Sequence, residues 1–180
     1  MPSIRGFPVR KQKDPYTCGL SSLGSLVSFL GKRRVEEGEL PSGFWAARLK
    51  AFLPSRFIGM FRDYVSDYSI ELTNPTREEI PGIFSRQLRD GLPVPILYST
   101  RNVLDRERPV YIHYSTVIGI DDRRENVTLA NPFGYEEKLR TGDLLDMMEY
   151  RNYKDRPVKV RLALLLGVIK RNSVFMIRKS

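Results

Sequence analysis

The chain has 180 residues, of which 41% are hydrophobic and 28% charged, and its formal net charge at pH 7 is +9. These values are typical of one globular domain with its own core, so we expect a single domain over residues 1–180. One cysteine and one histidine exclude an internal disulfide and a zinc site built from these two residue types alone. The excess positive charge favours an anionic partner but does not identify it.

The N-terminal stretch, MPSIRGFPVR, contains no apolar run of the kind that a secretory signal requires. The longest uncharged apolar run, LALLLGVI, lies between Arg161 and Lys170. It is too short for a bilayer-spanning helix, which needs about 20 residues. We therefore expect a cytoplasmic chain without a transmembrane segment.

Helical patterns dominate the first half of the chain. Apolar residues at helical spacing predict a helix over residues 18–30, followed by a glycine. A second helix is predicted over residues 54–68 because its apolar stripe follows a Pro-Ser entry signal. A shorter helix is predicted around Trp45 and Phe52, and another over residues 76–90, which open with a capping-box pattern.

The second half of the chain has the composition of β-strands. Two of its segments, 110–120 and 126–131, are joined by the short polar loop 121–125, which predicts an antiparallel hairpin. Helices followed by an antiparallel sheet predict an α+β domain. The elements predicted in this half are strands over 94–99, 110–120, 126–131, 158–169 and 173–178 and a helix over 141–150.

Four residues have side chains suited to acyl-transfer chemistry. Cys18 lies at the predicted N-terminus of a helix, where free N–H groups and the helix dipole favour a thiolate. His113 is the only imidazole in the chain that could serve as its base, and Asn131 is the candidate to orient that ring. The amide of Gln12 and the backbone N–H of Cys18 are candidate donors to an oxyanion. A thiolate–imidazolium pair would lower the thiol pKa below about 8.5 and raise the histidine pKa above about 6.5.

These residues occur in the order of a known motif set: Gln12-x5-Cys18-Gly19, then His113-x3-Val-Ile-Gly-Ile-Asp, then Asn131-Pro132. Over about residues 8–150 the chain resembles papain-like cysteine peptidases of the C39 and C39-like, bacteriocin-processing group. Many members of that group have an aspartate where this chain has Asn131. The resemblance implies a papain-like fold with an N-terminal helical lobe and a C-terminal antiparallel β-sheet lobe.

The resemblance also implies a role for each of the four residues. It makes Cys18 the nucleophile, His113 the base, Asn131 the residue that orients the imidazole and Gln12 the oxyanion donor. The implied reaction is hydrolysis of a peptide, isopeptide or other amide bond in a peptide or protein substrate. No cofactor is implied.

Three other interpretations remain open from the sequence. The same Cys-His-Asn set supports acyl transfer or deamidation in phytochelatin-synthase-like and transglutaminase-like enzymes, because an amine can resolve the thioester instead of water. A net charge of +9 also fits a non-catalytic basic domain that binds nucleic acid or another polyanion. A lone cysteine, finally, is often only a small buried hydrophobic residue.

Overall fold

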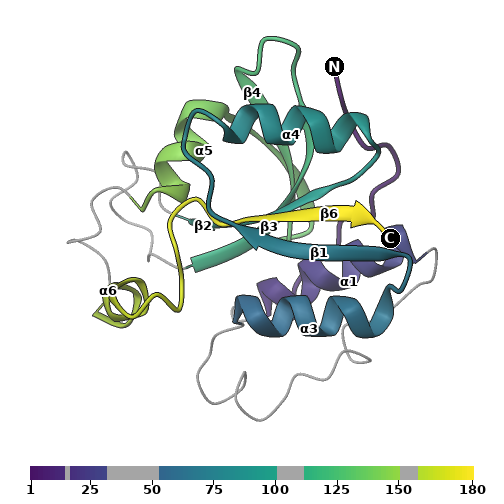
Figure 1. The fold of residues 1–180 in the computed structure, drawn as a ribbon. Coiled ribbons are helices and arrows are strands. Elements are labelled where there is room, and N and C mark those ends of the chain that lie inside the picture. Colours follow the sequence, from purple (N-terminus) through teal and green to yellow (C-terminus); the bar gives the residue numbers. More distant parts are fainter. Residues whose placement is uncertain (15–16, 32–52, 101–111, 151–157) are drawn as a thin grey trace.

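The structure is a computed structural model that describes residues 1–14, 17–31, 53–100, 112–150 and 158–180. These residues form helices on both sides of a β-sheet (Figure 1). The helices are α1 (Cys18–Leu30), α3 (Pro54–Tyr64), α4 (Ile80–Arg89), α5 (Thr141–Met148) and α6 (Val158–Leu165). The strands are β1 (Tyr68–Thr73), β2 (Val94–Ser99), β3 (Ile112–Ile120), β4 (Asn126–Asn131), β5 (Tyr135–Arg140) and β6 (Val174–Lys179).

In the described part of the chain, six strands form one antiparallel sheet in the order β1-β6-β2-β3-β4-β5. The last strand in the sequence, β6, lies between β1 and β2 (Figure 1). A strand from the helical first half therefore shares a sheet with the β-rich second half. The predicted α+β class and the antiparallel sheet are confirmed.

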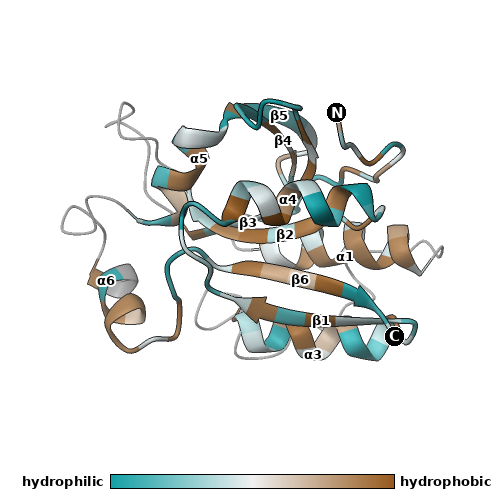
Figure 2. Ribbon diagram, turned by 45° about the horizontal axis from the view of Figure 1, so that its top comes forward, coloured by the Kyte–Doolittle hydropathy of each residue, from teal (hydrophilic) through white to brown (hydrophobic). Residues whose placement is uncertain are grey.

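Both faces of the sheet are covered by helices. In Figure 1, α4 and α5 lie above the sheet, and α1 and α3 lie below it. Along β2, Ile96 and Tyr98 pack in the core under α4 and α5, whereas Leu97 packs with α1 and α3. Strands buried on both faces read as nearly continuous apolar runs, which the brown colouring of the central strands in Figure 2 shows.

The N-terminal segment, residues 2–12, runs beside the sheet before the chain enters α1. Ser3 forms an antiparallel bridge with Gly119 in β3, and Lys11 forms one with Phe133, just after β4. The start of the chain is therefore held against the end of β4, far away in sequence. This contact decides where the residues that precede α1 can lie.

Several predicted elements are confirmed with small changes at their ends. The β3–β4 hairpin forms through the register that pairs Thr116 with Ala130. The helix predicted over 76–90 begins at Ile80, because Pro81 fits only the first turn of a helix. The other confirmed elements are the helix at 18–30, the strands at 94–99, 126–131 and 173–178, and the helix at 141–150, which ends at Met148.

The helix predicted over residues 54–68 is too long. It ends at Tyr64, where Val65 takes extended backbone angles. Tyr68 begins β1 instead and pairs with the end of β6. The helix predicted around Trp45 and Phe52 lies outside the described residues.

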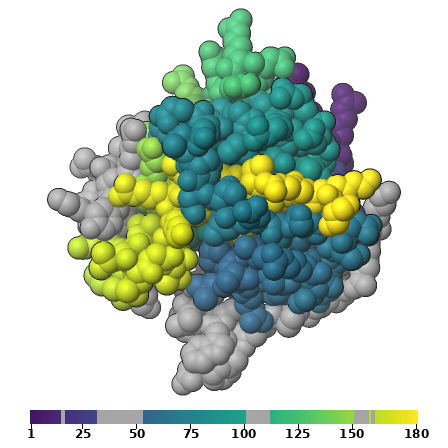
Figure 3. Space-filling model, in the orientation of Figure 1, coloured from purple at the N-terminus to yellow at the C-terminus, as the bar shows by residue number. Residues whose placement is uncertain are grey.

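The strand predicted over residues 158–169 is wrong, because residues Val158–Leu165 form the helix α6. An unbroken apolar run has no period that separates helix from strand, and leucine and alanine favour a helix. The side chains of Leu162 and Leu165 are 51% and 80% exposed, and α6 lies at the lower left of Figure 3. In the described ranges, no helix is both long and apolar enough to span a membrane.

Strand β5 was not predicted from the sequence. Its residues, YEEKLR, are mostly charged and largely exposed, so the strand lacks the apolar alternation on which strand prediction relies. It lies at the edge of the sheet and pairs with β4 only, within the described residues. Polar and charged side chains are the usual composition of an edge strand.

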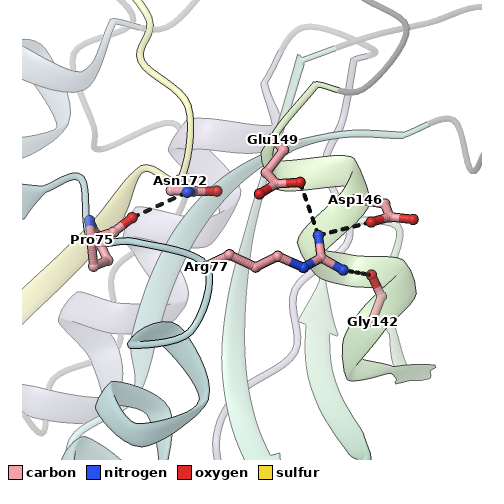
Figure 4. A network of polar contacts seen from close by, with 6 residues as sticks. All are labelled: Pro75, Arg77, Gly142, Asp146, Glu149 and Asn172. Atoms are coloured by element: carbon pink, nitrogen blue, oxygen red, sulfur yellow. Dashed lines mark hydrogen bonds and ion pairs between the residues drawn. The ribbon is translucent and has the colours of Figure 1, made fainter.

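Arg77 lies in the segment between β1 and α4, and its guanidinium links this segment to α5 (Figure 4). Its Nη1 lies 2.8 Å from Asp146 Oδ1 and 2.9 Å from Glu149 Oε2, and its Nη2 donates to the carbonyl of Gly142 at 3.2 Å. All three side chains are only about a quarter exposed: 25% for Arg77, 25% for Asp146 and 21% for Glu149. One guanidinium thus holds two carboxylates and one carbonyl in place at the end of the sheet.

Arg77→Met should lower the free energy of unfolding by about 2 kcal/mol, because it leaves two neighbouring half-buried carboxylates without their shared cation. Urea denaturation at pH 7 measures the change. Arg178→Met is the matched control, since Arg178 is 68% exposed and lies 3.7 Å from Glu71. That variant should stay within about 0.5 kcal/mol of the wild type. Equal losses in both variants would contradict the structural role of Arg77.

Candidate active site

His113 and Asn131 form a buried hydrogen bond. His113 Nε2 lies 3.2 Å from Asn131 Oδ1, and the two residues are 2% and 3% exposed. An amide oxygen can only accept, so Nε2 must carry the proton of this bond. The neutral ring therefore has its lone pair on Nδ1, where it can accept a proton from another group.

The hairpin predicted from the sequence is what brings these two residues together. His113 is the second residue of β3, and Asn131 is the last residue of β4. Thr116 pairs with Ala130, so Asn131 lies diagonally across the hairpin from His113. A diagonal pair of this kind is within reach of long or ring side chains.

Two further hydrogen bonds orient the amide of Asn131. Its Nδ2 donates to Glu137 Oε2 at 2.7 Å, and its Oδ1 accepts from the backbone N–H of Phe133 at 3.0 Å. Exchanging the amide oxygen and nitrogen would break both contacts, so they fix Oδ1 as the atom that faces His113. Glu137 was not identified from the sequence, because it lies on the unpredicted strand β5.

Aromatic rings enclose the imidazole on two sides. The ring of Phe133 stacks on His113 with centroids 4.9 Å apart and an interplanar angle of 21°. Tyr98 meets the imidazole edge-on, with centroids 5.6 Å apart. Burial lowers the His113 pKa from 6.5 to about 4, although the hydrogen bond with Asn131 acts in the opposite direction. His113 is therefore a neutral imidazole at pH 7.

Cys18 is the first residue of α1 and is 7% exposed. Burial raises the pKa of its thiol above the ordinary value, while hydrogen bonds from the backbone N–H groups of Tyr114, Gly19 and Cys18 itself act to lower it. Tyr114 follows His113 in β3, so the sulfur lies beside the strand that carries the imidazole. In the residues that the structure describes, no hydrogen bond joins the sulfur to the imidazole ring.

The pKa values expected for a thiolate–imidazolium pair are wrong for this structure. The pKa of Cys18 is raised and that of His113 is lowered, and burial is the largest cause of both shifts. A thiol and an imidazole in low-polarity surroundings are each more stable uncharged than charged. The resting site holds both groups in their neutral forms.

Gln12 lies beside the end of β4. Its backbone N–H donates to the carbonyl of Pro132 at 2.6 Å, and its side-chain Nε2 donates to the carbonyl of Asp14 at 2.8 Å. The side-chain amide carries a second N–H. Its Oε1 is buried without a hydrogen-bond partner among the described residues. The N-terminal segment thus brings Gln12, six positions before Cys18 in the chain, into contact with Pro132, the residue that follows Asn131.

All four residues predicted from the sequence are at most 9% exposed. Direct contacts join His113 to Asn131 and Gln12 to Pro132, while Cys18 contacts the backbone next to His113. In the described ranges, no group of three or more histidine, cysteine, aspartate or glutamate side chains is placed to hold a metal ion.

Comparison with known proteins identifies the fold. A scan of the sequence against protein families found no match, and neither did a search of curated proteins. Among solved structures, the chain is similar to a double glycine motif protease from an AMS/PCAT transporter, solved in complex with the leader peptide. The TM-score is 0.59 and the identity 11%, and the match covers 100% of this chain and 99% of that chain. It is also similar to the peptidase domain of Streptococcus ComA, a bifunctional ABC transporter of a quorum-sensing pathway, with a TM-score of 0.57 and 9% identity over 97% of this chain and 99% of that chain.

Both similarities extend over nearly the whole of each chain, whereas the identities are too low to carry more than architecture. The likeness to these peptidase domains agrees with the papain-like fold that the sequence motifs predict. The chain has the fold of double-glycine peptidase domains.

The lowered pKa of His113 predicts that acid destabilises the protein through this one residue. The unfolded chain, with a histidine pKa near 6.5, binds this proton between pH 6.5 and 4, whereas the folded chain, with a pKa of about 4, does not. The free energy of unfolding should therefore fall by about 2 kcal/mol between pH 7 and pH 5. Urea denaturation at several pH values in this range measures it.

His113→Gln is the control, because it removes the only histidine of the chain. The variant should lose most of the pH dependence between pH 7 and 5, whatever its stability at pH 7. If wild type and variant lose stability in parallel over this range, carboxyl groups rather than His113 bind the proton.

Proposed function

We propose that the chain is a cysteine peptidase that hydrolyses peptide or related amide bonds through Cys18, His113 and Asn131. The observation that carries this proposal is the buried Nε2–H bond from His113 to Asn131, because it leaves Nδ1 free to accept a proton. The position of Cys18 at the start of α1, beside the backbone that follows His113, adds support. The fold shared with peptidase domains agrees with this chemistry.

The reaction starts from a neutral pair. As Sγ of Cys18 attacks the carbonyl carbon of the substrate, its proton passes to Nδ1 of His113, and the carbonyl electrons move onto the oxygen. Charge separation thus accompanies bond formation instead of preceding it. This sequence suits a site in which burial raises the thiol pKa and lowers the imidazole pKa.

The tetrahedral intermediate carries a negative oxygen that needs hydrogen-bond donors. The second N–H of the Gln12 amide and the backbone N–H of Cys18 are the proposed donors. The imidazolium of His113 then gives its Nδ1 proton to the leaving nitrogen, and the C–N bond breaks. This leaves the acyl group on Cys18 as a thioester and His113 neutral again.

Water completes the cycle. It attacks the thioester while His113 Nδ1 takes a proton from it, and that proton returns to the sulfur as the C–S bond breaks. The products are a carboxylic acid, an amine and the free thiol. Asn131 keeps the imidazole in the Nε2–H tautomer through both halves of the reaction.

A peptide is the substrate class that we propose. The transporter protease of similar fold was solved in complex with the leader peptide, so this architecture binds a peptide in that protein. In the present chain, Phe133, whose ring stacks on the buried imidazole, is 45% exposed, and Tyr135, which pairs with Asn131 in the β4–β5 register, is 48% exposed. Their rings offer apolar contacts to substrate side chains near the scissile bond.

Cys18→Ala should abolish peptide cleavage, because no other thiol exists in the chain. Incubation with a diverse peptide mixture, followed by mass spectrometry of new termini, measures the activity. A peptidyl electrophile should also label Cys18 covalently, and His113→Ala should slow both reactions by about 10³-fold or more. Addition of free amines separates hydrolysis from acyl transfer, since transfer gives amide products in place of acids.

Ser25→Ala is the matched control, because Ser25 is also a small buried residue of α1. It should keep cleavage and labelling near wild-type rates. Cleavage that persists in Cys18→Ala would refute the proposal. So would labelling of Cys18 at the same rate with and without His113.

A further inference from the structure

We propose that Glu137 is a positioning residue of this site: its carboxylate holds the Asn131 amide against His113 and makes asparagine, instead of aspartate, the residue that fits at position 131. This inference rests on the proposed function, because it concerns how the same imidazole is oriented. It is carried by contacts that the peptidase chemistry does not itself require.

The Asn131 amide donates one hydrogen bond on one side and accepts two on the other. Nδ2 donates to Glu137 Oε2 at 2.7 Å, while Oδ1 accepts from His113 Nε2 at 3.2 Å and from the N–H of Phe133 at 3.0 Å. The group between a carboxylate and an imidazole N–H must donate on one side and accept on the other. An amide meets this requirement, and an ionised carboxylate does not.

An aspartate at position 131 would place two carboxylates face to face, where Nδ2 and Oε2 are now 2.7 Å apart. Like charges at this separation, in a half-buried place, repel strongly unless one of them takes up a proton. Asn131 is 3% exposed, so water offers little screening on its side. The new carboxylate would turn away from Glu137 or bind a proton, and either change disturbs its bond to His113.

The backbone holds Glu137 in reach of Asn131. The β4–β5 register pairs Asn131 with Tyr135 and Leu129 with Glu137, so the side chains at 131 and 137 are diagonal neighbours on one face. Gly134 makes the turn with a φ of +94°, and its N–H donates to the Asn131 carbonyl at 2.9 Å. Because this turn is short and hydrogen-bonded, the pairing of the two strands is fixed.

The charge of Glu137 also acts on Tyr98, a ring that contacts His113. It contributes to the raised pKa of Tyr98, the residue whose ring meets the imidazole edge-on. The Asn131 amide donates to this carboxylate and accepts from the imidazole, so the negative charge polarises the amide and thereby favours the imidazolium that forms during the reaction. Glu137 therefore acts on His113 through Asn131 without contact to the substrate.

The test compares four proteins: wild type, Glu137→Gln, Asn131→Asp and the double variant. Glu137→Gln should lower kcat by about threefold, since glutamine keeps an acceptor oxygen for Asn131 Nδ2 but loses the negative charge. Asn131→Asp should lower kcat by about 100-fold, with little change in KM. Adding Glu137→Gln to Asn131→Asp should raise kcat by about tenfold or more, because the glutamine amide can donate to the new carboxylate.

The sign reversal is the decisive result, since one substitution should slow the wild type and accelerate the Asn131→Asp variant. Glu136→Gln is the control: Glu136 is the neighbouring exposed residue of β5, opposite Ala130 in the register. Adding it to Asn131→Asp should leave the kcat of that variant unchanged. Independent effects of the changes at 131 and 137 on kcat would overturn the inference.

If the wild type cleaves no peptide, the proposed function fails while the positioning contact is still tested. The free energies of unfolding of the same four proteins then measure the coupling between positions 131 and 137. Asn131→Asp should destabilise the fold, and Glu137→Gln should restore stability in that variant alone. Additive free-energy changes would overturn the role of Glu137 independently of any activity.

Discussion

One hydrogen bond, from His113 Nε2–H to Asn131 Oδ1, decides what the site can do. It fixes the tautomer of the only histidine in the chain and leaves Nδ1 as the proton acceptor. The surrounding contacts keep this bond in place. The N–H of Phe133 and the carboxylate of Glu137 hold the amide in one orientation, and two aromatic rings keep water from the imidazole.

The same burial that protects this bond sets the charge state of the site. An ion pair between thiol and imidazole would need two buried charges, and burial outweighs the hydrogen bonds that favour each charged form, so both pKa shifts oppose the pair. In the proposed reaction, a neutral resting pair keeps the thiol protonated until the carbonyl group of the substrate is in place. The negative charge then develops on the substrate oxygen, near the proposed N–H donors, and no thiolate forms before the substrate is bound.

The sequence was sufficient to predict the β3–β4 hairpin, the helix that starts at Cys18 and the closeness of His113 to Asn131, because each follows from local periodicity or a short loop. Glu137 could not be found in this way, since an edge strand of charged residues has no apolar alternation. The helical state of residues 158–165 was missed because their apolar run fits helix and strand equally. The pKa directions depend on burial by α1, β2 and the turn after β4, which periodicity does not reveal.

The tautomer and charge of His113 are most directly measured by ¹⁵N NMR of its ring nitrogens, since a single histidine gives a single pair of signals. We predict a neutral ring with the proton on Nε2 and an unprotonated Nδ1, unchanged from pH 7 down to pH 5. Asn131→Ala should weaken this preference for one tautomer. A proton on Nδ1 of the neutral ring, or an imidazolium at pH 7, would contradict the orientation and the neutral resting state on which the proposed chemistry depends.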